Sequence, residues 1–393
     1  MRPDPTSPPR PRDPRLDFFR GSAMFIIFIA HCRGNVLWNI IPARYGVSDA
    51  ADMFVFLSGM AASIAFGGTF IRQGALIGTA RILYRCVQLF AAHLGLFFTG
   101  AMVIAAGTRY FGDIDYPSML NLERFYHDPG DALIGLFTLS YVPHYFDILP
   151  LYIAVLAMVP VAMLLARIHP YCTIAASILL WAVANRFMID LPANADDQPV
   201  WYFNPFAWQL IFFTGFALRR QWITVPLDSA LLFWGSVTVL LLGLGISLHV
   251  VFEHVPPIDW LRIWIYNHTD KTNLDLLQYV HFLAEAYVVV VLLKGREHML
   301  LEPPWRAFVR CGQQALSIYV TCEICAEIGG MVFDHAGQGW PVQIAVNAVG
   351  FAVLFAVAFI AAWAKRAPWK RVAAPAPASV PRERPLVAQE SGD

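Results

Sequence analysis

Apolar segments long enough to cross a lipid bilayer recur along this chain from one end to the other. A helix needs about 20 predominantly apolar residues to span the hydrocarbon core. Of the 393 residues, 58% are hydrophobic and only 14% are charged, whereas about a quarter of the residues of a soluble domain are charged. The pattern therefore predicts an all-α integral membrane protein. We expect ten spans, near residues 18–38, 52–71, 83–107, 147–166, 171–189, 205–219, 229–249, 274–293, 308–327 and 341–364.

The apolar segment 132–146 is bounded by Asp131 and Asp147 and is too short to span. We expect it to be re-entrant or interfacial. With ten spans, 21 of the 28 Lys and Arg residues lie on one side of the membrane. Counting 132–146 as a further span would move Lys294, Arg296 and the basic C-terminal segment to the opposite side. The positive-inside rule therefore predicts that both termini are cytoplasmic.

One membrane domain is expected over residues 15–366. The flanking segments 1–14 and 367–393 are rich in proline and charge, which predicts disordered cytoplasmic tails. The N-terminal segment lacks the apolar core of a cleaved signal peptide. The formal net charge is zero, so bulk charge gives no reason to expect a nucleic-acid partner. The six cysteines lie in or beside apolar segments and suit free thiols, and we expect no metal site.

A stripe of polar side chains follows one face of the first apolar helix. Because each helical residue turns by about 100°, Asp17, Arg20, His31 and Asn35 fall within about 60° of one another. His31 is then roughly 16 Å along the axis from Arg20. Ionisable groups are costly in lipid, so this stripe should face protein or a water-filled cavity.

His31 is the strongest catalytic candidate. Asp49 and Asp52 open the next span, and we expect them at a similar depth. A carboxylate beside an imidazole orients it and raises its basicity, as a general base requires. Two plainer interpretations stay open, since a membrane histidine can simply pack between helices and acids suit the first turn of a helix.

Arg72, Arg81 and Arg85 flank the inner turn between the second and third spans. Guanidinium groups recognise phosphates bidentately, so this cluster is a candidate binding site for a phosphorylated cofactor. Basic residues in an inner turn are also expected from topology alone. The chain has no Gly-rich phosphate loop of the Walker type.

Further polar residues lie in or beside the spans. His144 and Asp147 end the segment 132–146, and we group them with Asn35 as candidate substrate-binding residues. Two pairs of ionisable residues are four positions apart and share a helix face: His281 with Glu285, and Glu323 with Glu327. Intramembrane carboxylates suggest function, including proton relay, although such a pair can also satisfy itself. Acids and aromatics in the outer connections 108–131 and 250–273 suit either a sugar ligand or interfacial belts.

These motifs together resemble a known family. Arg15-x-Asp17-x-x-Arg20-Gly21 precedes the intramembrane His31, and residues 54–59 read Phe-Val-Phe-Leu-Ser-Gly. The combination is similar to the acyltransferase-3 superfamily of membrane acyltransferases. Ser-Asp-Ala-Ala-Asp at 48–52 brings it closer to the OpgC-like branch, which succinylates osmoregulated periplasmic glucans. Residues 147–152 and 316–319 resemble later segments of the family.

The resemblance implies an enzyme of the bacterial inner membrane that takes an acyl group, succinyl in this branch, from cytoplasmic acyl-CoA. The acceptor would be a hydroxyl of a periplasmic glucan, and acyl-CoA would be a co-substrate rather than a resident cofactor. His31 corresponds to the family's intramembrane histidine, and Asp17 and Arg20 to the charged positions before it. The imidazole would activate the hydroxyl directly or carry the acyl group as a covalent relay.

Two alternatives stay open at this point. One is acetylation of another surface polysaccharide, because the residues do not distinguish succinyl from other short acyl donors. The other is a secondary transporter, which would also have about ten spans with scattered intramembrane acids. Transporters often consist of two related halves with matched broken helices, and matched halves are not visible in this sequence.

Overall fold

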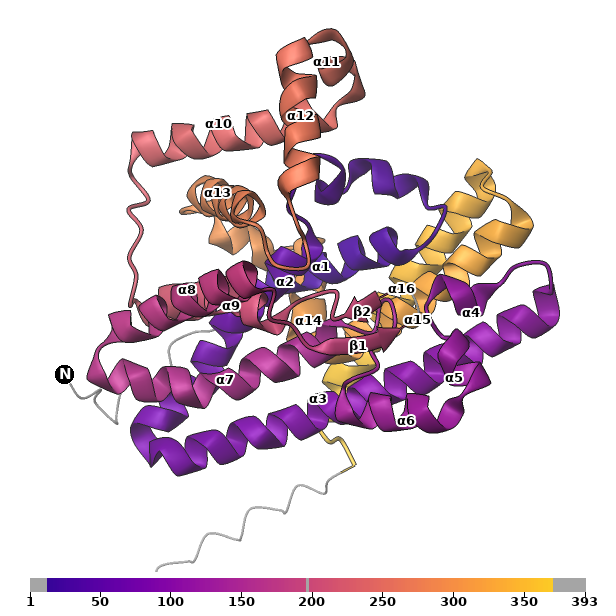
Figure 1. The fold of residues 1–393 in the computed structure, drawn as a ribbon, viewed down its shortest axis with the longest axis horizontal. Coiled ribbons are helices and arrows are strands. Elements are labelled where there is room, and N and C mark those ends of the chain that lie inside the picture. Colours follow the sequence, from indigo (N-terminus) through magenta and orange to yellow (C-terminus); the bar gives the residue numbers. More distant parts are fainter. Residues whose placement is uncertain (1–12, 196–197, 370–393) are drawn as a thin grey trace, which may run out of the picture.

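The computed structural model describes residues 13–195 and 198–369, which form a bundle of helices with one small hairpin (Figure 1). The helices of the first half are α1 (Pro14–His31), α2 (Ala50–Ala62), α3 (Gly68–Phe111), α4 (Tyr116–Met119), α5 (Glu123–His127), α6 (Pro129–Thr138), α7 (Ile148–Ile168) and α8 (Pro170–Phe187). Those of the second half are α9 (Pro205–Arg220), α10 (Ala230–Ser247), α11 (His249–His254), α12 (Pro256–His268), α13 (Leu276–Leu293), α14 (Trp305–Gln313), α15 (Ala315–Ala336) and α16 (Trp340–Lys365).

Short elements connect these helices. Strands β1 (Pro192–Ala195) and β2 (Gln198–Val200) pair antiparallel between α8 and α9. The 3₁₀ turns η1 (Val36–Ile40) and η2 (Pro42–Arg44) lie between α1 and α2, and η4 (Glu297–Leu301) precedes α14. A π-helical turn, η3 (Ser63–Gly67), joins α2 to α3. We call the end of the bundle at which α1 begins the inner end, and the end at which α1 stops the outer end.

The helical class expected from the sequence is confirmed, and six helical segments within the described residues are long and apolar enough to cross a membrane. These segments are Ala50–Phe111, Ile148–Ile168, Ala230–Ser247, Leu276–Leu293, Ala315–Ala336 and Trp340–Lys365. Three other expected spans coincide with α1, α8 and α9. α9 is shorter, with 16 residues, and α1 is more polar, with Arg15, Asp17 and Arg20.

Several boundaries differ from those expected. The span expected at 308–327 is divided at Gln314 into α14 and α15, and α15 continues to Ala336. α1 begins at Pro14, capped by the Asp13 side chain, and stops at His31, whereas the expected span ran to residue 38. The segment 132–146 begins within the ten-residue α6 (Pro129–Thr138). This helix is about 15 Å long and too short to cross a bilayer. The rest of the two expected tails, 1–12 and 370–393, lies outside the described residues.

Two glycine contacts hold the centre of the bundle together. A Cβ on Gly21 of α1 would lie 2.0 Å from the Phe308 carbonyl oxygen of α14, and one on Gly59 of α2 would lie 1.9 Å from the Phe212 carbonyl oxygen of α9. Backbones approach this closely only where the side chain is absent, which is how small residues pack membrane helices. The glycines of both sequence motifs therefore serve packing, and they fix the depth of the polar residues beside them.

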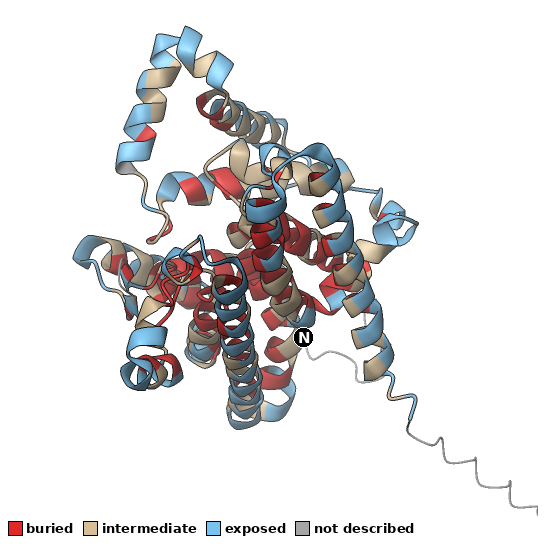
Figure 2. Cartoon of the chain, turned by 90° about the vertical axis from the view of Figure 1, so that its right-hand side faces the viewer, coloured by how far each residue is buried: buried red, intermediate tan, exposed pale blue. Residues whose placement is uncertain are grey.

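The inner turn between α2 and the long part of α3 is made at Gly74, whose φ of 85° lies in the left-handed region. Glycine adopts this region without the steric cost that a Cβ would bring. At the opposite side of the bundle, α10 to α13 lie at the periphery and α11–α12 project away from it (Figure 1). Figure 2 shows that buried residues concentrate in the central helices, while this peripheral group is mostly exposed.

Candidate active site

His31 is the last residue of α1, and its imidazole contacts two other elements. Its Nδ1 lies 2.7 Å from Oε2 of Glu323 in α15, and its ring centroid is 4.3 Å from that of Tyr145. With Nδ1 as the donor to this carboxylate oxygen, Nε2 is the ring nitrogen that remains for proton transfer. The His31 side chain is 26% exposed and that of Glu323 only 5%. The structure thus forms an oriented, partly accessible base.

The segment before α7 lies against the same imidazole. Tyr145 accepts a hydrogen bond from the Tyr319 hydroxyl through its carbonyl oxygen, at 3.3 Å. Asp147 is buried at the N-cap position of α7 and lies close enough to His31 and His144 to interact electrostatically with both. Of the candidate substrate-binding residues, Asp147 and His144 are therefore brought to the His31 cluster, which we define as His31, Tyr145, Asp147 and Glu323.

A second ion pair follows one turn further along α15. Arg33 Nη1 donates to Glu327 Oε2 at 2.8 Å, and its guanidinium carbon lies 5.6 Å from the centroid of the Tyr116 ring. Glu323 and Glu327 each bind one residue of the chain around the end of α1, so neither is paired with the other. Residues four apart on a helix are neighbours, so the two ion pairs are adjacent.

Asn35 is buried and holds the chain beyond α1 against α16. Its side-chain amide exchanges two hydrogen bonds with that of Asn347, at 2.9 and 3.1 Å. Gln343 donates to the Gly34 carbonyl oxygen at 2.7 Å and accepts from the Val36 amide at 3.1 Å. The Asn35 side chain thus fixes the backbone. Because α1 ends at His31, Asn35 is not on the helical stripe expected from the sequence and instead caps η1.

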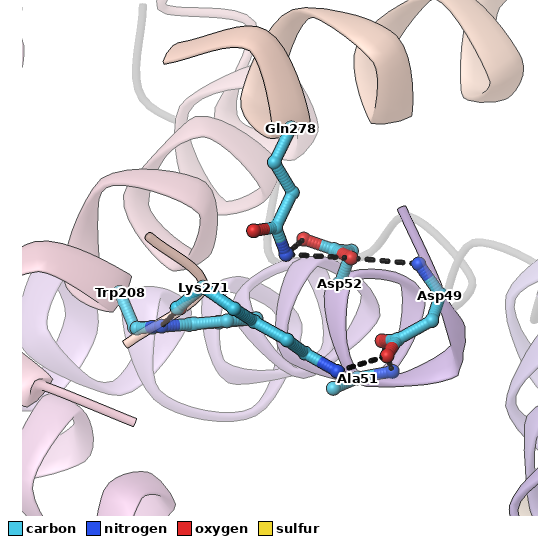
Figure 3. Close-up of polar contacts among 6 residues, drawn as sticks. All are labelled: Asp49, Ala51, Asp52, Trp208, Lys271 and Gln278. Atoms are coloured by element: carbon cyan, nitrogen blue, oxygen red, sulfur yellow. Dashed lines mark hydrogen bonds and ion pairs between the residues drawn. The ribbon is translucent and has the colours of Figure 1, made fainter. Parts of the chain in front are cut away.

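Asp49 and Asp52 have partners other than His31. They form a reciprocal capping box at the start of α2; Asp49 is also ion-paired with Lys271, and Asp52 accepts from Gln278 at 2.9 and 3.1 Å (Figure 3). The carboxylate hydrogen-bonded to His31 is that of Glu323. This corrects the expectation that Asp49 or Asp52 orients the imidazole, and capping explains both acids.

Lys271 belongs to a loop that is held by backbone contacts. The Trp208 indole donates to the carbonyl oxygens of Lys271 and Thr272, each at 3.1 Å. Burial lowers the pKa of the Lys271 ammonium, but the Asp49 carboxylate beside it outweighs burial, and the pKa is raised overall. The Lys271 ammonium therefore stays charged at neutral pH.

The remaining polar residues at this end of α2 bind α13. Ser48 Oγ lies 2.7 Å from His281 Nδ1 and donates to Glu285 Oε2 at 3.2 Å. The His281 ring fits between two glycines, because a Cβ on Gly46 or Gly243 would lie 2.6 or 2.5 Å from its Nε2. Ser48, Asp49 and Asp52 thus all bind residues 271–285, and we call these residues with their partners the Ser48 cluster.

Towards the inner end, a cavity of about 380 Å³ joins α1, α2, α3 and α7. Arg20, Arg81 and Arg85 line it together with Tyr152, and none of the described residues that line it is acidic. Arg81 donates to the Thr69 hydroxyl at 2.7 Å, and Arg85 to Gln88 at 3.1 Å. We call this the inner cavity; its three guanidinium groups are of the kind that bind anions such as phosphate.

Two residues of the sequence-based assignment lie away from this cavity. Arg72 is exposed beyond it, beside Gly68. Asp17 is buried and accepts from Gln313 of α14 at 3.4 Å. Arg20, which we expected to act with His31, is instead placed with Arg81 and Arg85 in the inner cavity.

A second cavity, of about 490 Å³, opens at the outer end. It lies between the chain from Ile29 to Asn39 and the residues around the α15–α16 turn, and we call it the outer cavity. Its polar and aromatic lining consists of Arg33, Asn35, Trp38, Asn39, Gln338 and Gln343. α1 therefore extends from one cavity to the other, with His31 near its outer end.

The main residue that sequence reasoning missed is Glu323 as the partner of His31. Its spacing from Glu327 indicated either a functional role for the two acids or a pair that satisfies itself, and it did not identify His31 as the partner of Glu323. Two side chains near this site whose types can act as nucleophiles, those of Ser58 and Cys32, are only 1% and 2% exposed. The Ser58 hydroxyl has no hydrogen-bond partner among the described residues, so no base is positioned to activate it.

The fold and the site define a helical membrane protein that holds an oriented histidine between two cavities. A family model described as OpgC protein matches residues 12–366. The chain therefore belongs to the OpgC family, and membership implies an acyltransferase. No curated protein matches the sequence significantly.

Proposed function

We propose that this protein is an enzyme of the bacterial inner membrane that transfers a succinyl group from cytoplasmic acyl-CoA to a hydroxyl of a periplasmic glucan. The observation that carries the proposal is the imidazole of His31. It is oriented by Glu323, and it ends a helix whose inner half contributes Arg20 to a cationic cavity. Donor and acceptor approach from opposite sides, so the reaction needs a base between them.

The inner cavity suits the phosphates of a coenzyme A thioester. Three guanidinium groups supply paired donors in the planar geometry that phosphate oxygens accept, and the described lining of the cavity holds no acidic residue that would repel a phosphate. Arg20, Arg81 and Arg85 are therefore proposed to hold the donor.

The first turns of α7 connect this cavity to His31. Tyr152 lines the cavity and interacts with Arg20 and Arg85, while Asp147 interacts with His31. Asp147 and Tyr152 are five positions apart, which corresponds to about 7.5 Å along a helix. This is shorter than the roughly 16 Å between Arg20 and His31 along α1. A thioester held by its phosphates in the inner cavity would extend past Tyr152 towards the imidazole.

We propose that His31 acts as a general base. Nε2 removes the proton of the acceptor hydroxyl as its oxygen attacks the thioester carbonyl carbon; the C–S bond breaks, and the imidazolium returns the proton to the leaving thiolate. Glu323 keeps Nδ1 protonated and stabilises the imidazolium, as a carboxylate does for a catalytic histidine. Ester and free thiol are formed without net proton change.

The decisive experiment is acyl transfer by the purified full-length protein in lipid nanodiscs. Labelled succinyl-CoA and acetyl-CoA are offered separately with a neutral glucan, and the products are analysed by mass spectrometry. We expect succinylated glucan from the wild type and none from H31A, while H249A, which changes an exposed histidine of α11, retains full activity. Full activity of H31A contradicts the role of His31. Transfer from acetyl-CoA alone contradicts the succinyl donor, and glucan movement without covalent change indicates a transporter.

The same preparation separates direct transfer from a covalent relay. Labelled succinyl-CoA is added without glucan, and the protein is analysed intact. Direct transfer predicts unmodified protein. A stoichiometric acyl group on His31 that is released by hydroxylamine would contradict direct transfer and support the relay.

A further inference from the structure

The outer cavity differs in charge from the inner one. Its single charged lining residue among those described is Arg33, and the Arg33 guanidinium is ion-paired with Glu327 at 2.8 Å. The pair leaves the cavity close to neutral. A phosphate or carboxylate ligand would have to compete with Glu327, whereas an uncharged ligand would not.

The rest of the lining offers amide groups and one aromatic face. Trp38 is 42% exposed, and Asn39 and Gln338 carry amides that both donate and accept hydrogen bonds. An indole offers an apolar ring face and an N–H donor at its edge. It therefore suits a flat, partly apolar ligand that is rich in hydroxyl groups. This set of groups matches the chemistry of a neutral sugar ring.

Arg33 connects this cavity to the His31 cluster. It lines the cavity, and its partner Glu327 lies one turn from Glu323 on α15. Tyr145, whose ring contacts that of His31, also interacts electrostatically with Arg33. His31 itself is not part of the cavity wall, so the cavity is beside the reacting atoms and not around them.

We propose that the outer cavity is a carbohydrate-binding subsite, which holds a neutral sugar unit of the acceptor chain through stacking on Trp38 and hydrogen bonds to Asn39 and Gln338. The unit that it holds is a neighbour of the one that is acylated at His31. The inference rests on the proposed function for its link to catalysis, but binding itself needs no acyl donor.

The first test measures binding without acyl-CoA. Laminarihexaose, cellohexaose and maltohexaose are added separately to the full-length protein in nanodiscs, and binding is followed by saturation-transfer NMR. We expect at least one hexasaccharide to bind, with a tenfold or greater loss in W38A and partial retention in W38F. W260A, which removes a 67% exposed tryptophan of α12, serves as the matched control and should bind as the wild type does.

Equal binding by W38A and wild type overturns the subsite, as does the absence of binding of all three sugars to the wild type. Q338A provides a second test in case W38A does not fold. Residue 338 is exposed in the α15–α16 turn, and loss of its amide should also weaken binding several-fold. Thermal unfolding of each variant is measured in parallel.

The second test measures transfer kinetics. We expect W38A to raise KM for the glucan about tenfold while KM for acyl-CoA stays unchanged. Trp38-dependent binding without any acyl transfer by the wild type would reject the proposed function and keep the subsite. Normal transfer with an unchanged glucan KM in W38A would reject the subsite and keep the proposed function.

Discussion

The His31 cluster and the Ser48 cluster both place a histidine and buried carboxylates between helices, but they differ in what is left accessible. His31 has one ring nitrogen bound to Glu323 and keeps 26% of its side chain exposed. His281 is bound to Ser48 and is closed in by Gly46 and Gly243. One ring nitrogen of each histidine is hydrogen-bonded, so the difference is one of access: an exposed ring fits catalysis, whereas an enclosed ring fits architecture.

The carboxylates show the same difference. Asp49 and Asp52 are used by the capping box, Lys271 and Gln278, so each acid is balanced locally. One carboxylate oxygen of Glu323 is hydrogen-bonded to His31. The other oxygen is buried without a hydrogen-bond partner among the described residues. An under-satisfied buried carboxylate costs free energy, which is expected where function sets the arrangement.

The largest contrast should come from the two histidines. We expect H31Q to lower kcat by about 10³-fold or more, because general-base catalysis is lost, and H281Q to lower it only a few-fold. Initial rates of glucan acylation at saturating donor measure both. Comparable losses in the two variants would remove the distinction between the clusters.

A smaller effect is expected at the carboxylate that orients the base. E323Q keeps the shape but cannot stabilise an imidazolium, so kcat should fall roughly 100-fold with little change in either KM. D52N is the matched change in the Ser48 cluster and should leave kcat within a few-fold of wild type. An E323Q enzyme with wild-type kcat would contradict the role of Glu323.

Packing around His281 should govern stability. A Cβ on Gly243 would lie 2.5 Å from His281 Nε2, so G243A should lower the free energy of unfolding by about 1–3 kcal/mol. G235A on the same helix meets nothing within 4 Å and provides the control. Thermal unfolding in nanodiscs compares them, and equal stability of the two variants would show that the His281 ring moves aside.

The smallest effect is expected at Lys271. Its side chain is 37% exposed, so solvent screening limits the ion pair with Asp49 to about 1 kcal/mol at most, and K271M should shift the unfolding temperature only slightly. The raised pKa keeps the Lys271 ammonium charged through its ordinary titration range. The contribution of this ammonium to stability is therefore constant from about pH 6 to 9 and is lost only as pH rises through the raised pKa. If the difference in unfolding temperature between K271M and the wild type changed markedly between about pH 6 and 9, the role given to Lys271 would be contradicted.

Much of the helical fold could be predicted from sequence because hydrophobic length carries the signal. The expected spans at 205–219 and 274–293 correspond closely to α9 and α13. The division of the span at 308–327 could not be foreseen, because it accompanies the close contact of Gly312 with the Asp17 carbonyl oxygen, where a Cβ would lie 1.7 Å away. Contacts between distant segments leave no local pattern.

The candidate site could be predicted only where its residues share one helix. Helical periodicity placed His31 and Arg20 on one stripe, but it could not show that they serve different clusters, since α1 is long enough to reach both. The partner of His31 lies 292 positions away in the sequence. Spacing within a helix revealed Glu323 and Glu327 as a pair, and only the packing of α15 against α1 gave each of them a separate cation or imidazole.

The amide pair between Asn35 and Asn347 has a consequence for biosynthesis. The wall beside Gly34 and Val36 is completed by Gln343 of α16, which is the last helix of the described chain to leave the ribosome. A nascent protein that has inserted its first fifteen helices would already contain His31 and Glu323, yet its outer binding surface would be unfinished. Residue 343 would therefore have to be translated before this wall of the outer cavity could form.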